Sequence, residues 1–161
     1  MDLRGNPGGN IWPMLAGVAP LLTDGHVMSF DSTSHSEAVT VNRDQVMLDG
    51  KQVAHAPDTI PKSGLPVAVL LSRSTASSAE GVAIAFVGQP GTRSFGQPSA
   101  GLSTANTPIR LRDGAVVNLT NAVDVDRTGK RYGVPVIPDV QSNQAALDAA
   151  RWLNAHKEPP S

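Results

Sequence analysis

The sequence predicts a single α/β domain, and three observations indicate this fold class. An unbroken apolar run of strand length at 67–71 precedes a short polar turn and a helical pattern of small and apolar residues at 79–87. Asp-Gly pairs at 49–50 and 113–114 each separate two short apolar runs, which is the sequence pattern of a tight β-hairpin. Apolar residues at 143–156 have the spacing of an amphipathic helix.

Composition limits the classes of partner and chemistry. The chain has 161 residues, is 40% hydrophobic and carries a formal net charge of -1, which suits one domain with a substantial core. Acidic and basic residues are mixed along the chain, so we expect neither nucleic acid nor an anionic membrane surface as a partner. No apolar run is long enough to span a membrane. The chain has no cysteine, so a nucleophile must be an oxygen or an amine.

A glycine-rich loop at 2–10 opens the chain and precedes a helical apolar pattern at 11–22. The pair Gly8 and Gly9 can bring the backbone close to a ligand and present adjacent N–H groups to an anion. A plain turn is the alternative interpretation, because two glycines before a helix are common. The loop has no strand in front of it, so we expect the chain to be part of a longer protein.

Short strands are predicted through the middle of the chain. Alternating patterns predict strands at 26–30 and 38–41, and a further strand is predicted at 92–95. The segment 56–66 holds three prolines and a glycine, so we expect an irregular connector there. The polar composition of 96–106 is typical of a loop.

Ser77 lies between the predicted strand at 67–71 and the predicted helix at 79–87. A serine at such a corner holds its hydroxyl outside the sheet, where the unpaired N–H groups of the helix's first turn face the same space. This arrangement suits attack on a carbonyl group. The alternative is structural, because Ser77 and Glu80 have the spacing of a capping box, in which the serine only begins the helix. On pattern alone, the capping role is favoured.

The four histidines do not have the spacing of a metal site. Three of them lie in segments of solvated composition, so surface or structural roles are expected for His26, His35, His55 and His156. We therefore expect no metal site.

Four blocks of sequence carry a family resemblance: DLRGNPGGN (2–10), STASSAEGVAIA (74–85), FGQPSAGLSTAN (95–106) with LRDGAVVNLT (111–120), and DRTGKRYGVPVIPDV (126–140). In this order and spacing they resemble the tail-specific, or C-terminal processing, serine peptidases of the S41 type. The resemblance implies a ClpP/crotonase-like α/β fold, in which helices pack on a mixed sheet with additional β-hairpins. It implies a peptidase core at 1–156 that lacks its N-terminal part, and a C-terminal tail at 157–161.

The resemblance also implies hydrolysis of peptide bonds through an acyl-enzyme, with Ser77 as the nucleophile. The oxyanion hole would consist of the backbone amide of Ser78 and an amide of the glycine loop, from Gly8 or Gly9. The two loops, each a weak signal alone, thus indicate one site, and the prediction depends on their meeting in space.

The sequence departs from the family at the general base. Many members place a lysine in a block of the form FGKGxxQ, where a neutral amine takes the proton of the serine. Here Leu102 stands at the lysine position and Asn106 at the position of the helping glutamine. Leucine cannot accept a proton, so this chain cannot use a serine–lysine dyad. Other branches of the family draw the base from a histidine before the glycine loop, and we expect an upstream base here.

Three residues are candidates for supporting roles at the site. Glu80 can orient the site, although capping is the favoured role, and Asn106 occupies the glutamine position. Asp139 is a candidate acidic partner, with a strand-ending turn residue as the alternative. Lys130 lies in a charged turn and is not expected to be the base.

Two functions remain open at this point. The first is a serine peptidase core that acts on polypeptides, requires no cofactor and has weak activity or none without its upstream segment. The second is a catalytically inactive peptide-binding or assembly domain that keeps the peptidase fold, which the loss of the family lysine favours. A homo-oligomer is compatible with both functions, and the family resemblance implies a location in the cell envelope or periplasm.

Overall fold

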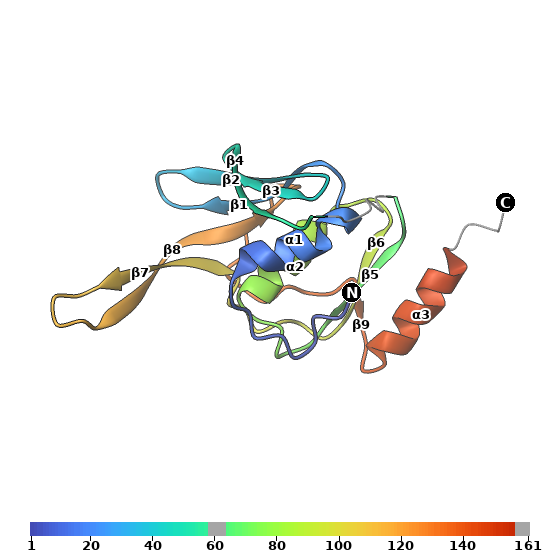
Figure 1. The fold of residues 1–161 in the computed structure, drawn as a ribbon. Helices are drawn as coiled ribbons and strands as arrows, with labels where there is room; N and C mark the ends of the chain where they lie inside the picture. The colour runs from blue at the N-terminus through green and yellow to red at the C-terminus, as the bar shows by residue number, and fades with distance from the viewer. Residues whose placement is uncertain (58–63, 157–161) are drawn as a thin grey trace.

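The computed structural model describes residues 1–57 and 64–156. An antiparallel sheet, a pair of helices, a parallel sheet and a last helix are stacked as successive layers (Figure 1). The expected mixed α/β architecture with additional β-hairpins is confirmed. The predicted tail and residues 58–63 of the predicted connector lie outside the described residues.

The larger sheet has six antiparallel strands in the order β4-β3-β2-β1-β8-β7. In chain order these strands are β1 (Gly25–Asp31), β2 (Ser36–Asn42), β3 (Gln45–Leu48), β4 (Lys51–His55), β7 (Thr104–Arg110) and β8 (Val116–Asp126). The first Asp-Gly pair joins β3 to β4 as predicted, with positive φ angles of 47° at Asp49 and 77° at Gly50. Positive φ at both central residues is what a two-residue hairpin turn requires.

The hairpin of β7 and β8 is longer than the sequence predicts. β7 begins at Thr104, inside the segment expected to be a loop, and β8 continues from Val116 to Asp126. The outer part of the hairpin exposes both faces to solvent, so its residues do not show the alternation of a half-buried strand. Polar composition was therefore a poor guide to the start of this strand.

The smaller sheet is parallel, with the order β5-β6-β9 for β5 (Val67–Leu71), β6 (Thr92–Gly96) and β9 (Val140–Gln141). The start of the chain pairs with the free edge of β5. The Leu3 N–H donates to the Leu70 carbonyl at 3.0 Å, and the Leu70 N–H donates to the Met1 carbonyl at 3.0 Å. This pairing carries the glycine-rich loop to the end of β5, where Ser77 follows.

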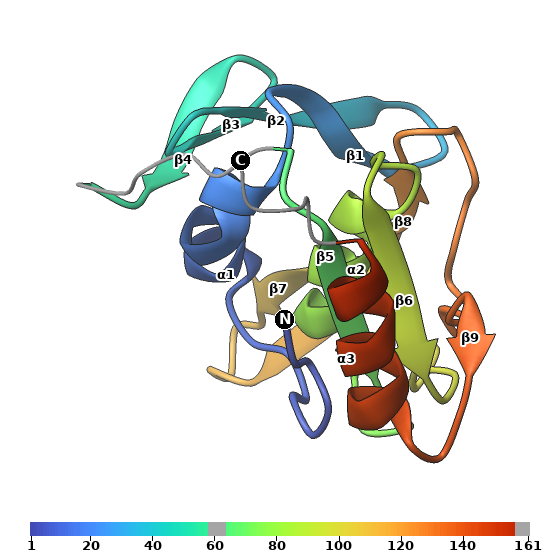
Figure 2. The same cartoon turned by 90° about the vertical axis from the view of Figure 1, so that its right-hand side faces the viewer.

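Helices cover both faces of the parallel sheet. The helices α1 (Ile11–Val18) and α2 (Ser78–Phe86) lie between the two sheets, and α3 (Ala145–Ala155) lies on the outer face of β5 and β6 (Figure 2). Every residue of α2 after Ser78 is buried. Because β5 packs against α2 on one face and α3 on the other, its sequence is apolar without alternation.

The first helix is shorter than predicted. After Val18 the chain forms a 3₁₀ turn at Ala19–Leu21, because Pro20 has no N–H to continue the α-helical hydrogen bonds. Within residues 1–57 and 64–156, each helix is too short or too polar to cross a membrane.

Gly96, at the end of β6, is expected to tolerate no side chain. Its φ is +126°, and a Cβ atom there would lie 2.0 Å from the carbonyl oxygen of Leu71. We expect Gly96→Ala to lower the free energy of unfolding by about 3 kcal/mol or more, measured by urea denaturation.

Gly114→Ala is the matched control, because Gly114 also has a positive φ, of 88°, but no atom lies within 4 Å of its Cβ position. The control should cost about 1 kcal/mol. Equal losses in the two variants would contradict the explanation by steric overlap.

Candidate active site

Ser77 occupies a strained backbone position between β5 and α2. Its φ and ψ are 53° and −125°, a region that residues other than glycine rarely adopt. Neighbouring hydrogen bonds hold the turn: the Thr75 hydroxyl donates to the Leu3 carbonyl at 2.9 Å, and the Ala76 N–H donates to the Asn6 carbonyl at 3.0 Å. The glycine-rich loop therefore supplies acceptors that fix the turn before Ser77.

The glycine-rich loop lies directly against Ser77. A Cβ atom on Gly8 would lie 2.7 Å from the Cβ of Ser77 and 2.8 Å from the carbonyl oxygen of Ala76, so only glycine fits there. The hydroxyl of Ser78 donates to the Gly9 carbonyl at 2.6 Å, which joins the two corners a second time. Two segments about seventy residues apart in the sequence thus share one site.

Two backbone amides at this junction donate no hydrogen bond to any described residue: those of Gly9 and Ser78. Ser78 is the first residue of α2, where helix N–H groups lack acceptors within the helix. The amide of Gly8, by contrast, donates to the side-chain oxygen of Asn6 at 3.0 Å. Gly8 permits the close approach, whereas the N–H groups of Gly9 and Ser78 remain without an acceptor among the described residues.

Glu80 is fully buried beneath Ser77 and accepts hydrogen bonds from four donors. The Ser77 N–H donates to it at 2.8 Å, the Gly101 N–H at 2.9 Å and the Leu102 N–H at 2.8 Å, and the Ser99 hydroxyl donates as well. The Ser77 bond is the glutamate half of the expected capping box. Because its oxygens are so engaged, Glu80 holds the backbone of Ser77 and the 99–102 segment in place.

Asp124, on β8, is a residue that the sequence analysis missed. Its side chain lines the same cavity as Ser77, although the residue is only 3% exposed. Burial, and secondarily the nearby charge of Glu80, raises the pKa of Asp124 to about 7. Its carboxylate accepts no hydrogen bond from the described residues. A carboxylate oxygen lies 3.5 Å from the position that a Cβ atom on Gly81 would occupy, so the missing side chain of Gly81 leaves room for Asp124 beside α2.

The cavity at Ser77 has a volume of about 590 Å³. Its walls are formed by the start of α1, the start of α2 and the strands β1, β2, β3, β7 and β8 of the antiparallel sheet. Its polar or titratable lining residues include Ser77, Ser78, His35, Glu37, Asn106 and Asp124. The space is large enough to hold a short stretch of polypeptide.

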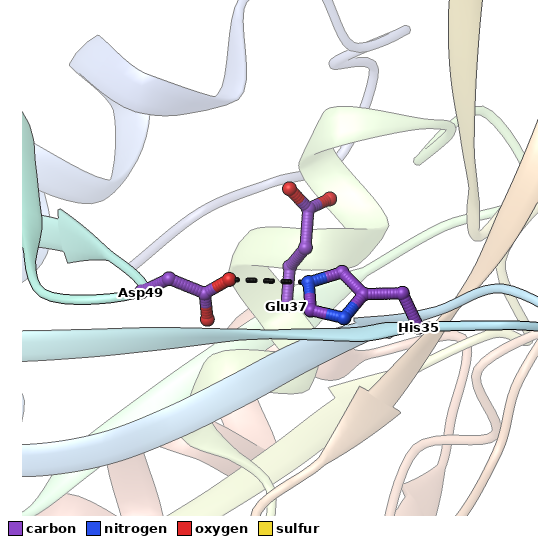
Figure 3. A group of neighbouring side chains, drawn as sticks. All are labelled: His35, Glu37 and Asp49. Carbon is purple, nitrogen blue, oxygen red and sulfur yellow. Dashed lines mark hydrogen bonds and ion pairs between the residues drawn. The ribbon is translucent and has the colours of Figure 1, made fainter.

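His35 and Glu37 stand on the rim of this cavity beside Asp49 of the neighbouring hairpin (Figure 3). His35 Nε2 lies 3.3 Å from a carboxylate oxygen of Asp49. Among the described residues, His35, Glu37 and Asp49 are the one group of at least three histidine, cysteine, aspartate or glutamate side chains whose potential metal-ligand atoms all lie within 4.8 Å of one another. The His35 side chain is 65% and the Asp49 side chain 44% exposed, and Glu37 is half-buried, so the group is an exposed histidine–carboxylate contact with a second carboxylate beside it.

The supporting candidates separate in space. Asn106 lines the Ser77 cavity, and its side-chain oxygen accepts a hydrogen bond from the Thr120 hydroxyl at 2.7 Å. Asp139 instead accepts from the N–H and the hydroxyl of Ser94, each at 2.7 Å, and lines a different cavity together with Lys130. The structure therefore does not bring Asp139 to Ser77, and the turn role is the one that its contacts fit.

A sequence model described as Peptidase family S41 matches residues 1–142 of the chain. The chain belongs to this family. The nisin-resistance protein of Lactococcus lactis subsp. lactis is 36% identical over 157 residues, which cover 96% of this chain and 49% of that protein. Membership of family S41 supports a peptidase-type function.

Solved structures agree with this S41 assignment. A lipoprotein from Streptococcus agalactiae superposes with a TM-score of 0.81 at 30% identity, covering 97% of this chain and 54% of that chain. The photosystem II D1 C-terminal processing protease superposes with a TM-score of 0.65 at 25% identity, covering 88% of this chain and 33% of that chain. The chain thus spans about half the length of the nisin-resistance protein and of the lipoprotein that it matches.

Gly8→Ala tests the contact between the glycine-rich loop and Ser77. The added Cβ would overlap Ser77, and the φ of +101° is strained for alanine, so we expect the free energy of unfolding to fall by about 3 kcal/mol. Gly9→Ala is the control, because Gly9 has a φ of +136° but meets only the end of Met14, at 3.5 Å. The control should lose about 1 kcal/mol in thermal unfolding. If Gly8→Ala is no worse than Gly9→Ala, the two corners are not in contact.

The buried carboxyl of Asp124 predicts a pH dependence of stability. Its pKa rises from the ordinary 3.8 to about 7 on folding, so the folded state binds the proton more tightly and stability falls as pH rises between these values. Asp124→Asn cannot ionise, so its free energy of unfolding relative to the wild type should rise by about 4 kcal/mol across this window. Urea denaturation at about pH 4 and about pH 8 measures the difference. Parallel pH profiles for the two proteins would contradict a buried, proton-binding Asp124.

Proposed function

We propose that this chain carries the nucleophile and the oxyanion hole of a serine peptidase that hydrolyses peptide bonds in polypeptides. The observation that carries this proposal is the close contact between the Ser77 corner and the glycine-rich loop. That contact places a strained serine beside the amides of Gly9 and Ser78, which donate no hydrogen bond to any described residue. An acyl-enzyme mechanism would require the same arrangement, a serine nucleophile beside two N–H donors for the oxyanion.

In the proposed reaction, the hydroxyl oxygen of Ser77 attacks the carbonyl carbon of the peptide bond and gives its proton to a base. The negative charge moves to the carbonyl oxygen, where the N–H groups of Gly9 and Ser78 would bind it. The amine of the second fragment leaves with a proton from the base, and water then hydrolyses the acyl-enzyme. Glu80 keeps the Ser77 backbone in position through the 2.8 Å hydrogen bond described above.

The base is proposed to be a histidine from a segment upstream of this chain. Leu102 occupies the position of the family lysine, and Lys130 lines a different cavity, so neither supplies a base. His35 reaches only the rim and is paired with Asp49. Asp124 suits the role of an acidic partner, because a carboxylate without hydrogen bonds in the Ser77 cavity can accept the N–H of an imidazole and orient it.

A second function is supported by a specific observation. The loss of the family lysine at Leu102 also fits a peptide-binding or assembly domain that keeps the S41 fold without catalysis. Such a domain would use the cavity of about 590 Å³ to hold a polypeptide without cleaving it.

We also propose a location in the cell envelope. The similarity to a streptococcal lipoprotein supports this location, and so does the similarity to a protein named for nisin resistance. We further propose a tail-specific mode of cleavage, which the similarity to a C-terminal processing protease supports.

Labelling with a fluorophosphonate probe separates the two functions. Such probes phosphonylate a serine that is activated for attack and seated beside an oxyanion hole. We expect the full-length wild-type protein, with the segment upstream of this chain, to be labelled. Ser77→Ala should reduce labelling by about a hundredfold or more. Ser74→Ala, an exposed serine of the same turn, is the control and should label like the wild type.

Each other result has a defined meaning. Labelling that survives Ser77→Ala would remove Ser77 from the mechanism. A wild-type protein that resists labelling while it still binds unfolded polypeptide would favour the non-catalytic function.

A further inference from the structure

The outer half of the β7–β8 hairpin extends away from the body of the protein as an arm, residues 106–121 (Figure 1). All of its strand residues are exposed, which distinguishes it from the inner half, where Ala122 and Asp124 are buried. Even so, the arm carries large apolar side chains at Ile109, Val117 and Leu119, which are 42%, 46% and 52% exposed. A run of exposed apolar residues on a projecting element indicates an interaction site.

These apolar residues share one face of the arm. Ile109 is paired with Val117, and Leu119 is paired with Thr107, two residues earlier on β7. Because side chains alternate between the faces of a strand, these two pairs point to the same side. The pairs on the other side are mostly polar: Asn106 with Thr120, Pro108 with Asn118, and Arg110 with Val116. The arm is therefore amphipathic, and no part of the chain within residues 1–57 and 64–156 covers its apolar face.

The apolar face of the arm begins at residues that line the Ser77 cavity. Thr107 and Asn121 both line that cavity, and the Asn121 side-chain amide donates to the Thr107 hydroxyl at 2.9 Å. Ala105, two residues before Thr107 and on the same face of β7, packs against the main core. Asn106, on the opposite face, also lines the cavity, but the path over Thr107 leads directly onto Leu119, Ile109 and Val117.

We propose that the apolar face of the arm, Ile109, Val117 and Leu119, extends the substrate site and binds apolar side chains of an extended polypeptide. This inference rests on the proposed function, and it adds a preference for apolar residues at a distance from the peptide bond that is cut. An extended chain repeats its side-chain direction every two residues, about 6.8 Å, which matches the spacing from Thr107 to Ile109 along β7. Alternate side chains of the polypeptide can therefore contact the arm in series.

The contact is proposed to involve the face of the arm rather than its edge. β7 is an outer strand of the sheet, and Pro108 in its middle has no N–H to donate to an added strand. Proline on an edge strand disfavours pairing with another chain. Recognition would accordingly depend on side chains, and it should be sensitive to single substitutions on the apolar face.

Two adjacent valines provide a matched test. Val116 and Val117 are 53% and 46% exposed and point to opposite faces of the arm. In the intact protein with Ser77→Ala, which prevents cleavage, we would measure the Kd for fluorescently labelled β-casein, an unfolded polypeptide. We expect Val117→Thr and Leu119→Thr each to raise the Kd about three- to tenfold, because each removes apolar contact area. Val116→Thr should leave the Kd unchanged.

Two outcomes would overturn the inference. One is an equal effect, or no effect, of Val116→Thr and Val117→Thr on the Kd. The other is a wild-type dimer in sedimentation that Val117→Thr alone converts to a monomer, since the face would then join two copies of the chain.

Fluorophosphonate labelling of the arm variants that retain Ser77 separates this inference from the proposed function. Normal labelling with an unchanged Kd would contradict the role of the arm and leave the peptidase proposal intact. Failure of the wild type to label would contradict the peptidase proposal itself.

Discussion

The arrangement of the site depends on one buried carboxylate, that of Glu80. It joins the first turn of α2 to the segment at 99–102, and it accepts the N–H of Ser77. A carboxylate without such donors would be costly to bury, so the loops must approach it closely enough to donate. This requirement fixes the position of the 99–102 segment relative to the turn at Ser77. The residue that the sequence identifies as a helix cap thus also joins the turn at Ser77 to the 99–102 segment.

The strained conformation of Ser77 is maintained by its neighbours. Its positive φ of 53° is unfavourable, but the turn before it is bonded to the glycine-rich loop through Ala76 and Thr75. Gly8 then lies so close that any side chain would collide with Ser77. Since the strain is distributed over contacts between distant segments, it is the tertiary fold that determines the geometry of this turn.

Local patterns in the sequence were sufficient for much of the fold. The Asp49–Gly50 turn and the unbroken apolar run of β5 carry their own signals, because both follow from backbone sterics or burial on two faces. Motif blocks also placed Ser77 and the glycine-rich loop. Asp124 was missed because its significance depends on which face of β8 is covered by α2, which one sequence does not state. The sequence did offer one signal, because Asp124 lies within a predicted strand whose other residues are apolar.

The pairing of Met1 and Leu3 with Leu70 has a consequence for how the protein folds. Residues separated by almost seventy positions must find one another before the glycine-rich loop can reach Ser77, and the two hairpins of β1 to β4 lie in the intervening stretch. Contacts of such high sequence separation are slow to form. On the ribosome, the site therefore cannot assemble until α2 has emerged. Until then the glycine-rich loop lacks the segment against which it packs in the folded protein.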